Sequence, residues 1–533
     1  MGQWRRSRRG VLAVAAALTL GATVAATSVS ASAPEPAGGT LTVDTSFILQ
    51  SLDPARTVTP TMTIATRAMY DTLLRASGED TTPQPSVAES FEASEDATVY
   101  TFHLRDDVVF ADGTPLTSAD VVWSFNRLAN LQLGGSYLIT GITPSAPDDH
   151  TVVLTSETPN PAIPVIVATP AFAILNSALV TENGGTDASD APEADSSETW
   201  FNSNSAGSGP YVLESYQTDD TVILARNPNW WGETLPDWDR VVIRNMPAAT
   251  QLLNVQRGQF EIAIDLSATQ AQSLEGNSDV TVRANESPNL FRVQMNMDEA
   301  ASATSSNPHI QEAVRYAINY EAMVQLGGVG SVQAAGLLPT VVAGSLPIEE
   351  ATQQDVERAQ AAVEASGIED PSLTMSYPSD INVNGIQFAT FAQRVAADLE
   401  EVGISVELEA LPVTTYLDEW RTGLMEMTLT YSYPDFMDPT SFAGYLPGGS
   451  DAVRAGWQEG ADPELEALGA EMSATVDDAE RASLAQDIQR RLNEAGPYMP
   501  LLQTAQAIVS TNDLTNVVLD PSWTLDVAAV EAA

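Results

Sequence analysis

Side chains that usually perform covalent chemistry are scarce in this sequence. It has no cysteine and no lysine, and its three histidines are His103, His150 and His309. These absences exclude a lysine-containing phosphate loop, a Schiff base, a thiol nucleophile and a zinc–thiolate site. The histidines lie far apart, with no His-Glu-x-x-His pattern, and no Gly-x-Ser-x-Gly elbow occurs. We therefore expect no cofactor and no metal. If the protein were a hydrolase, its catalytic groups would have to be carboxylates.

The charge balance is strongly acidic. Against 71 acidic residues stand 23 arginines, which gives a formal net charge of -48. Such a field repels phosphate backbones and anionic lipids, so we expect no nucleic-acid partner and no membrane-surface binding. Self-repulsion of this size is screened only by concentrated salt. We therefore interpret the acidity as an adaptation to saline surroundings.

Residues 1–31 have the pattern of a secretory signal peptide. Arg5, Arg6, Arg8 and Arg9 precede an apolar run that starts at Val11, and small residues up to Ala31 follow. No cysteine follows the run, so a lipoprotein anchor is not expected. An uncleaved membrane anchor is the alternative, but the run is short and rich in alanine. We expect export and cleavage, leaving a soluble, periplasmic or cell-surface (extracellular) protein with about -52 charges, from 19 arginines and 71 acids.

The body of the chain alternates helical and strand patterns, which predicts an α/β protein. At 533 residues it exceeds one usual core, so several subdomains are expected. A strand is predicted at 100–104, and Thr117 with Asp120 forms a capping box before a helix. Further helices are predicted from 308, over 388–402 and around 484–492. The acidic segment 182–199 is predicted to be a solvated loop.

Several sequence blocks, in order along most of the chain, resemble the extracellular solute-binding proteins of family 5, the dipeptide, oligopeptide and nickel-binding receptors of ABC importers. The blocks are Leu52-Asp53-Pro54 with Met69 to Leu74, Tyr100 to Arg105 with Phe110 to Thr117 and Asp120-Val121, Gly207 to Tyr211 with Arg226 to Trp231, Val314 to Ile318, and Asp435 to Phe442. Many blocks in the family's order are strong evidence for the family but weaker evidence for the identity of the ligand.

The resemblance implies a type II periplasmic-binding-protein fold: two α/β lobes with a hinge and an extra subdomain in the first lobe. Mapped onto this chain, lobe I comprises 38–80, 205–287 and 498–533, with an inserted subdomain at 81–204, and lobe II comprises 288–497. The chain would cross between lobes near Pro288 and near Pro497, residue types that suit segment boundaries. The lobes would close around the ligand by hinge motion.

The same resemblance implies a set of ligand-binding residues. Asp435 matches the aspartate that anchors the α-ammonium of a bound peptide. Tyr431, Ser432 and Tyr433 would supply strand-edge backbone groups, and the two tyrosines supply aromatic surface where relatives place a tryptophan. Further candidates, by rough position, are Trp420 and Arg421 for the distal end of the ligand, Tyr137, and the segment Thr59 to Thr63 just before the first helix, with Met62 and Thr63.

We therefore predict a monomeric peptide receptor that partners a membrane permease and performs no catalysis. One alternative is a receptor of the same family for another solute, such as an oligosaccharide or a metal chelate. The other is a secreted hydrolase using two carboxylates, which would need acids about 5–9 Å apart across a cleft.

Overall fold

The computed structural model describes residues 38–46, 51–56, 60–78, 80–522 and 524–533, all within one compact unit, Pro36–Ala533. The predicted signal peptide lies outside these residues. Within them, no helix combines the length and the apolar character needed to cross a bilayer.

The described strands are β1 (Thr40–Thr45), β2 (Leu74–Ser77), β3 (Asp80–Pro85), β4 (Ala88–Ala93), β5 (Val99–Leu104), β6 (Ile142–Asp148), β7 (Thr151–Ser156), β8 (Tyr211–Gln217), β9 (Thr221–Arg226), β10 (Arg240–Asn245), β11 (Glu261–Leu266), β12 (Val280–Met295), β13 (Val332–Gln333), β14 (Ser372–Pro378), β15 (Asn382–Val383), β16 (Ile386–Gln387), β17 (Ser405–Leu411), β18 (Met427–Ser432), β19 (Tyr498–Thr511), β20 (Leu514–Thr515), β21 (Leu519–Asp520), β22 (Thr524–Leu525) and β23 (Glu531–Ala532).

The α-helices are α1 (Pro60–Met69), α2 (Ser118–Leu131), α3 (Ile163–Ile166), α4 (Ser177–Glu182), α5 (Ala191–Ala194), α6 (Glu198–Phe201), α7 (Ala248–Val255), α8 (Ala268–Gln272), α9 (Pro308–Ala317), α10 (Tyr320–Gly327), α11 (Val356–Ser366), α12 (Phe388–Glu401), α13 (Val413–Arg421), α14 (Ser450–Arg454), α15 (Pro463–Ala474) and α16 (Asp478–Ala495). Short 3-10 turns are η1 (Ser136–Ile139), η2 (Pro170–Phe172), η3 (Ile348–Glu350) and η4 (Pro439–Tyr445).

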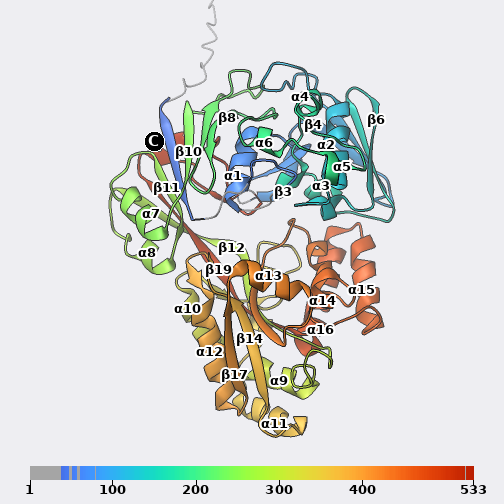
Figure 1. Ribbon diagram of the computed structural model, residues 1–533, viewed down its shortest axis with the longest axis vertical. Helices are drawn as coiled ribbons and strands as arrows, with labels where there is room; N and C mark the ends of the chain where they lie inside the picture. Colours follow the sequence, from blue (N-terminus) through green and yellow to red (C-terminus); the bar gives the residue numbers. More distant parts are fainter. Residues whose placement is uncertain (1–37, 47–50, 57–59, 79, 523) are drawn as a thin grey trace, which may run out of the picture. The chain divides into compact units, whose positions relative to one another are not determined.

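Two long antiparallel strands, β12 and β19, hold the main sheet together. Its order is β17-β14-β18-β12-β19-β11-β1-β10-β9-β8, and Figure 1 shows β12 and β19 side by side. Separate apolar cores lie on either side of this pair, one built on β1, β10 and β11 and another on β12, β14, β18 and α12. Because both strands contribute to both halves of the sheet, they are the covalent links on which a hinge would depend.

The ladder between β12 and β19 is interrupted in the middle. Glu286 pairs with Ala505 and Leu290 with Gln503, so the residues between Glu286 and Leu290 leave the register. Pro288 lies in this gap and has no N–H to donate to a ladder, which explains the interruption. The backbone is therefore free of sheet pairing at the point where the sequence predicts the first crossing. The residue ranges assigned to the lobes and the inserted subdomain stay a prediction.

A second sheet carries much of the segment 81–204. It is antiparallel, with order β4-β5-β7-β6. Tyr100, Phe102 and Leu104 alternate inward along β5, as their spacing predicts, and pack against Val121 and Phe125 of α2. The predicted capping box is present at the start of α2, where Thr117 and Asp120 bond each other's backbone N–H groups. The predictions of this strand and of this helix start are therefore confirmed.

Three further helices begin or end as predicted. Asn307 caps α9 by accepting from the N–H groups of His309 and Ile310, with Pro308 in the first turn. The apolar stripe from Phe388 forms α12, after which Gly403 adopts a positive φ and β17 follows. The late stripe forms α16.

The prediction of a solvated loop at 182–199 is wrong for part of its length. The segment contains α5 and the first turn of α6, and Asp195 between them has a fully buried side chain. Asp195 accepts from Arg127 Nε at 2.8 Å and from Arg56 Nη2 at 3.0 Å. Arg127 also donates to Asp53 at 2.6 Å. A buried guanidinium requires such partners, and composition alone does not show that one lies beneath the loop.

Candidate ligand-binding site

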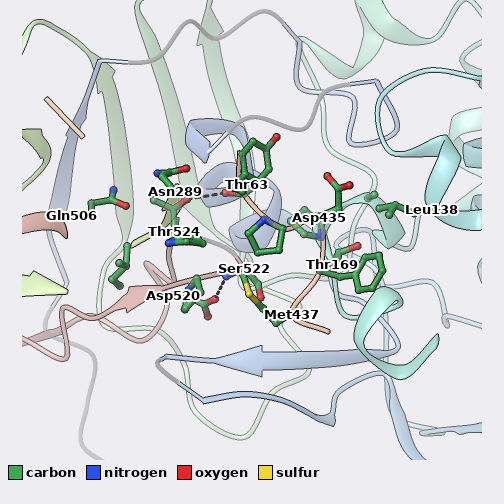
Figure 2. Close-up of a pocket in the computed structure, with 18 of the residues that line it drawn as sticks. Thr63, Leu138, Thr169, Asn289, Asp435, Met437, Gln506, Asp520, Ser522 and Thr524 are labelled. Atoms are coloured by element: carbon green, nitrogen blue, oxygen red, sulfur yellow. Dashed lines mark hydrogen bonds between the residues drawn. The ribbon is translucent and has the colours of Figure 1, made fainter. Parts of the chain in front are cut away.

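A cavity of about 950 Å³, its open mouth included, lies beside the interrupted ladder. Residues from eight separate parts of the chain line it (Figure 2). Seven of these parts are Thr63 of α1, Tyr137 and Leu138 of η1, Thr169 to Ala171, Pro288 and Asn289 of β12, Tyr431 and Tyr433 to Met437 at the end of β18, Gln506 of β19, and the hairpin residues Leu519 to Ser522 with Thr524. Val383 completes the described lining. The cavity thus draws on both sides of the β12–β19 pair.

Asp435 enters this cavity because of the chain path after β18. Strand β18 pairs with β12 up to Ser432, which lies opposite Leu290. Pro434 follows, and proline cannot extend the ladder. The chain therefore leaves the sheet, and the carboxylate of Asp435 lies against the cavity, hydrogen-bonded to the side chain of Tyr137. These two residues are almost 300 positions apart in the sequence and come from different lobes of the predicted division.

The environment of Asp435 favours neutralisation. Although its side chain is accessible from the cavity, protein surrounds it on several sides, and this burial raises the pKa of its carboxyl. The hydrogen bond from Tyr137 lowers that pKa, and the negative charge of Asp451 raises it. Among the described residues, no cation lies within ion-pair distance of Asp435. A ligand ammonium at this position would supply the missing counter-charge.

Tyrosine rings flank the carboxylate. Tyr431 and Tyr433 stack with ring centroids 6.3 Å apart, and Tyr433 and Tyr137 remain 42% and 54% exposed. Burial raises the pKa of all three phenols, and the charge of Asp435 raises those of Tyr137 and Tyr433 further. The phenols are therefore neutral near pH 7 and offer ring faces as well as hydroxyl groups to a ligand.

A smaller cavity shares the wall formed by Tyr433, Pro434 and Asp435. Ser432 lines this second cavity together with Tyr445 and Asp451, and its side chain hydrogen-bonds to Tyr445. Asp451 lies 3.7 Å from Arg292 Nη2 and 3.6 Å from Arg454 Nη1. The negative charge of Asp451 is therefore balanced, whereas that of Asp435 is not.

The structure brings five predicted residues to the large cavity and Ser432 to the smaller one. The five are Asp435, Tyr431, Tyr433, Tyr137 and Thr63. Their roles in binding a ligand stay predictions. Thr63 lies within α1, which begins at Pro60, so the expectation of a segment before the first helix is wrong for Met62 and Thr63; Thr59 lies outside the described residues.

The other predicted residues lie elsewhere. Met62 is 1% exposed and packs in the core beside Ile64, because the helix turns it away from the cavity. Arg421 is exposed on α13 and pairs with Asp418 at 3.0 Å. The guanidinium of Arg454 lies over the ring of Trp420, with Cζ of Arg454 4.2 Å from the ring centroid. Neither Trp420 nor Arg421 lines either cavity.

Several polar lining residues had no sequence signal. Thr169, Gln506 and Ser522 belong to segments without a recognisable motif. Thr63 and Thr524 face each other with their hydroxyl oxygens 3.2 Å apart (Figure 2), which joins the first helix to the last hairpin. Only Asn289, next to the predicted crossing at Pro288, could have been suspected from its position.

The chemistry available to this site is recognition by charge, hydrogen bonds and aromatic surface. Within the described residues, no three His, Asp or Glu side chains gather in a way that could hold a metal ion. The carboxylate of Asp435 is suited to a cation, and the backbone released from the ladder near Pro288 is suited to an extended chain.

Comparison with known proteins identifies relatives over most of the chain. The probable D,D-dipeptide-binding periplasmic protein DdpA of Escherichia coli (strain K12) is 28% identical over 489 residues, covering 89% of this chain and 90% of the relative. The Helicobacter pylori periplasmic binding protein DppA, solved with peptide STSA, has a TM-score of 0.78 at 20% identity, covering 93% and 98% of the two chains. The protein AgaA of A. tumefaciens R10, solved with agropinic acid, has a TM-score of 0.77 at 22% identity, covering 93% and 99%.

These structural likenesses confirm the predicted type II, two-lobe α/β fold. The model of "Bacterial extracellular solute-binding proteins, family 5 Middle" matches residues 82–453, more than half of the chain. The predicted family is thereby confirmed. The protein belongs to the bacterial extracellular solute-binding proteins of family 5.

Proposed function

We propose that this protein is the receptor of an ABC importer, which captures peptides outside the cytoplasm between its two lobes and delivers them to a membrane permease. The observation that carries the proposal is Asp435, a carboxylate facing the cavity with no ion-pair partner among the described residues. A peptide supplies an α-ammonium that would pair with it. Tyr137, already bonded to Asp435, would orient the carboxylate toward the ligand.

The peptide backbone finds complementary groups on both sides of this anchor. Tyr433 to Asp435, just past Ser432, and Pro288 with Asn289 are outside the sheet ladder yet border the cavity, and the N–H of Asn289 is already bonded to Ser287 Oγ. An extended peptide would bond such groups much as an added strand bonds a sheet edge, with little dependence on side chains. Contacts made on both sides of β12 and β19 would favour the closed arrangement, which the permease would then recognise.

Relatives support the peptide assignment in part. The name of the Escherichia coli relative describes D,D-dipeptide binding, and the Helicobacter pylori structure contains a tetrapeptide. The structure solved with agropinic acid shows that the same fold accepts another solute. A receptor of the same family for a non-peptide solute, such as an oligosaccharide or a metal chelate, is therefore the second candidate. We propose binding without catalysis, because Asp451, the acid whose charge acts on Asp435, is itself balanced by two arginines.

Native mass spectrometry of the protein purified from its own culture tests the proposal. We expect retained peptides, released by acid and identified by fragmentation. Incubation of the protein with labelled peptides and glycans then separates binding from turnover. Retention of a sugar or a chelate, or cleavage of any probe, would contradict a peptide receptor.

A further inference from the structure

Among the described residues, no basic side chain lines the site. All 19 arginines from Arg56 onward belong to the described residues, and none of them lines the large cavity or the smaller one. No described histidine lines them either. Because the sequence has no lysine, no other permanent cation is available from the chain after residue 37. A ligand carboxylate inside this site would find no counter-charge.

Acidic side chains are present instead. Asp435 and Asp520 both line the large cavity, and Figure 2 shows them on separate parts of its wall, with Asp520 beside Ser522. Oδ1 of Asp520 accepts a hydrogen bond from the backbone N–H of Ser522 at 2.9 Å. Arg292 and Arg454 are occupied by Asp451 and do not reach the lining. The charged side chains that the described lining contributes to the large cavity are therefore acidic.

The tyrosines favour the same kind of ligand by a different interaction. The exposed rings of Tyr137 and Tyr433 border the same cavity as Asp435. A guanidinium or ammonium group over such a ring is attracted by its electron-rich face, and more so where water is scarce. A carboxylate over the same ring gains nothing. The acidic side chains and the aromatic rings thus both favour a cationic ligand over an anionic one.

We propose that the site selects cationic peptides and discriminates against a short peptide whose free carboxyl end would lie inside the cavity. This inference rests on the proposed peptide-binding function and specifies its substrate class. Like charges within a few ångströms in a partly dry cavity cost enough to separate ligands that differ only in their carboxyl end.

Three tetrapeptides test the charge preference by isothermal calorimetry at low ionic strength. They are Ala-Arg-Ala-Ala amide, the same peptide as the free acid, and Ala-Glu-Ala-Ala amide. We expect the arginine amide to bind at least about tenfold more tightly than either other peptide. Equal or tighter binding of the free acid would overturn the inference while leaving peptide capture intact. If none of the three binds, the proposed function fails as well.

A cation added to the cavity should reverse the preference. Gln506 lines the cavity on β19, and Gln506→Lys adds a positive charge with little change in length. We expect the ratio between amide and free-acid affinities to fall at least about threefold. Gln325→Lys, the same change on the exposed surface of α10, is the control and should leave the ratio unchanged. An unaltered ratio in a folded Gln506→Lys protein would contradict the inference; if that variant does not fold, the wild-type comparison decides.

Discussion

Replacing Asp195 by asparagine should destabilise the protein by about 2 kcal/mol at pH 7, and the loss should shrink on acidification. Burial alone would raise the pKa of Asp195, but the hydrogen bond and charge of Arg127 outweigh it and lower this pKa from 3.8 to about 2. That difference corresponds to ~2.4 kcal/mol of folding free energy. Because the folded pKa is the lower one, this contribution is complete above about pH 5 and disappears as the pH falls through 2.

Urea unfolding of both proteins at pH 7, 5, 4 and 3, followed by tryptophan fluorescence, measures this difference. We expect it to fall to roughly half its neutral value by pH 3. Asp190→Asn changes an exposed aspartate of the same loop and is the control, with an effect near zero at every pH. A loss below about 0.5 kcal/mol at pH 7, or a loss that does not depend on pH, would refute the buried network as described.

Three further predictions concern charge. Ligand affinity should fall as the pH drops through the raised pKa of Asp435, while ordinary aspartates are still ionised, because only the carboxylate attracts an ammonium; calorimetry giving an affinity that stays constant from pH 7 down to 3.8, the ordinary pKa of an aspartate, would contradict this. Arg421→Ala should change the dissociation constant less than about twofold, because Arg421 pairs with Asp418 outside the cavity. A larger loss of affinity would show that Arg421 contributes to ligand binding. The melting temperature should rise between low and about 1 M KCl, because salt screens the net charge of -48; an unchanged value would remove the saline interpretation.

Local sequence signals predicted the elements well where short-range physics decides them. The capping box at Thr117, the N-cap at Asn307 and the inward alternation along β5 depend only on near neighbours in the chain. The two-lobe fold came from resemblance rather than from these signals, because sheet order depends on long-range pairing. The prediction of a solvated loop at 182–199 is partly wrong for the same reason, because the burial of Asp195 depends on Arg127, which is far away in the sequence.

The site was predictable only where a motif carried it. Asp435 and its tyrosine neighbours follow a recognisable block, and they do line the cavity. Met62 was placed by rough position, and the exact turn of α1 decides that it faces the core. The hairpin that contributes Asp520 and Ser522 lies near the C-terminus, and nothing in its sequence shows that it meets α1.

The central claim is that Asp435 anchors a ligand ammonium. Its most direct test is a thermodynamic cycle that measures the binding of a peptide and of its N-acetylated form to the wild type and to Asp435→Asn. Asp418→Asn, on the exposed face of α13, is the control. We expect the wild type to prefer the free ammonium by more than about tenfold, ~1.4 kcal/mol, and Asp435→Asn to lose that preference. A free peptide that binds Asp435→Asn with an unchanged dissociation constant would contradict the account.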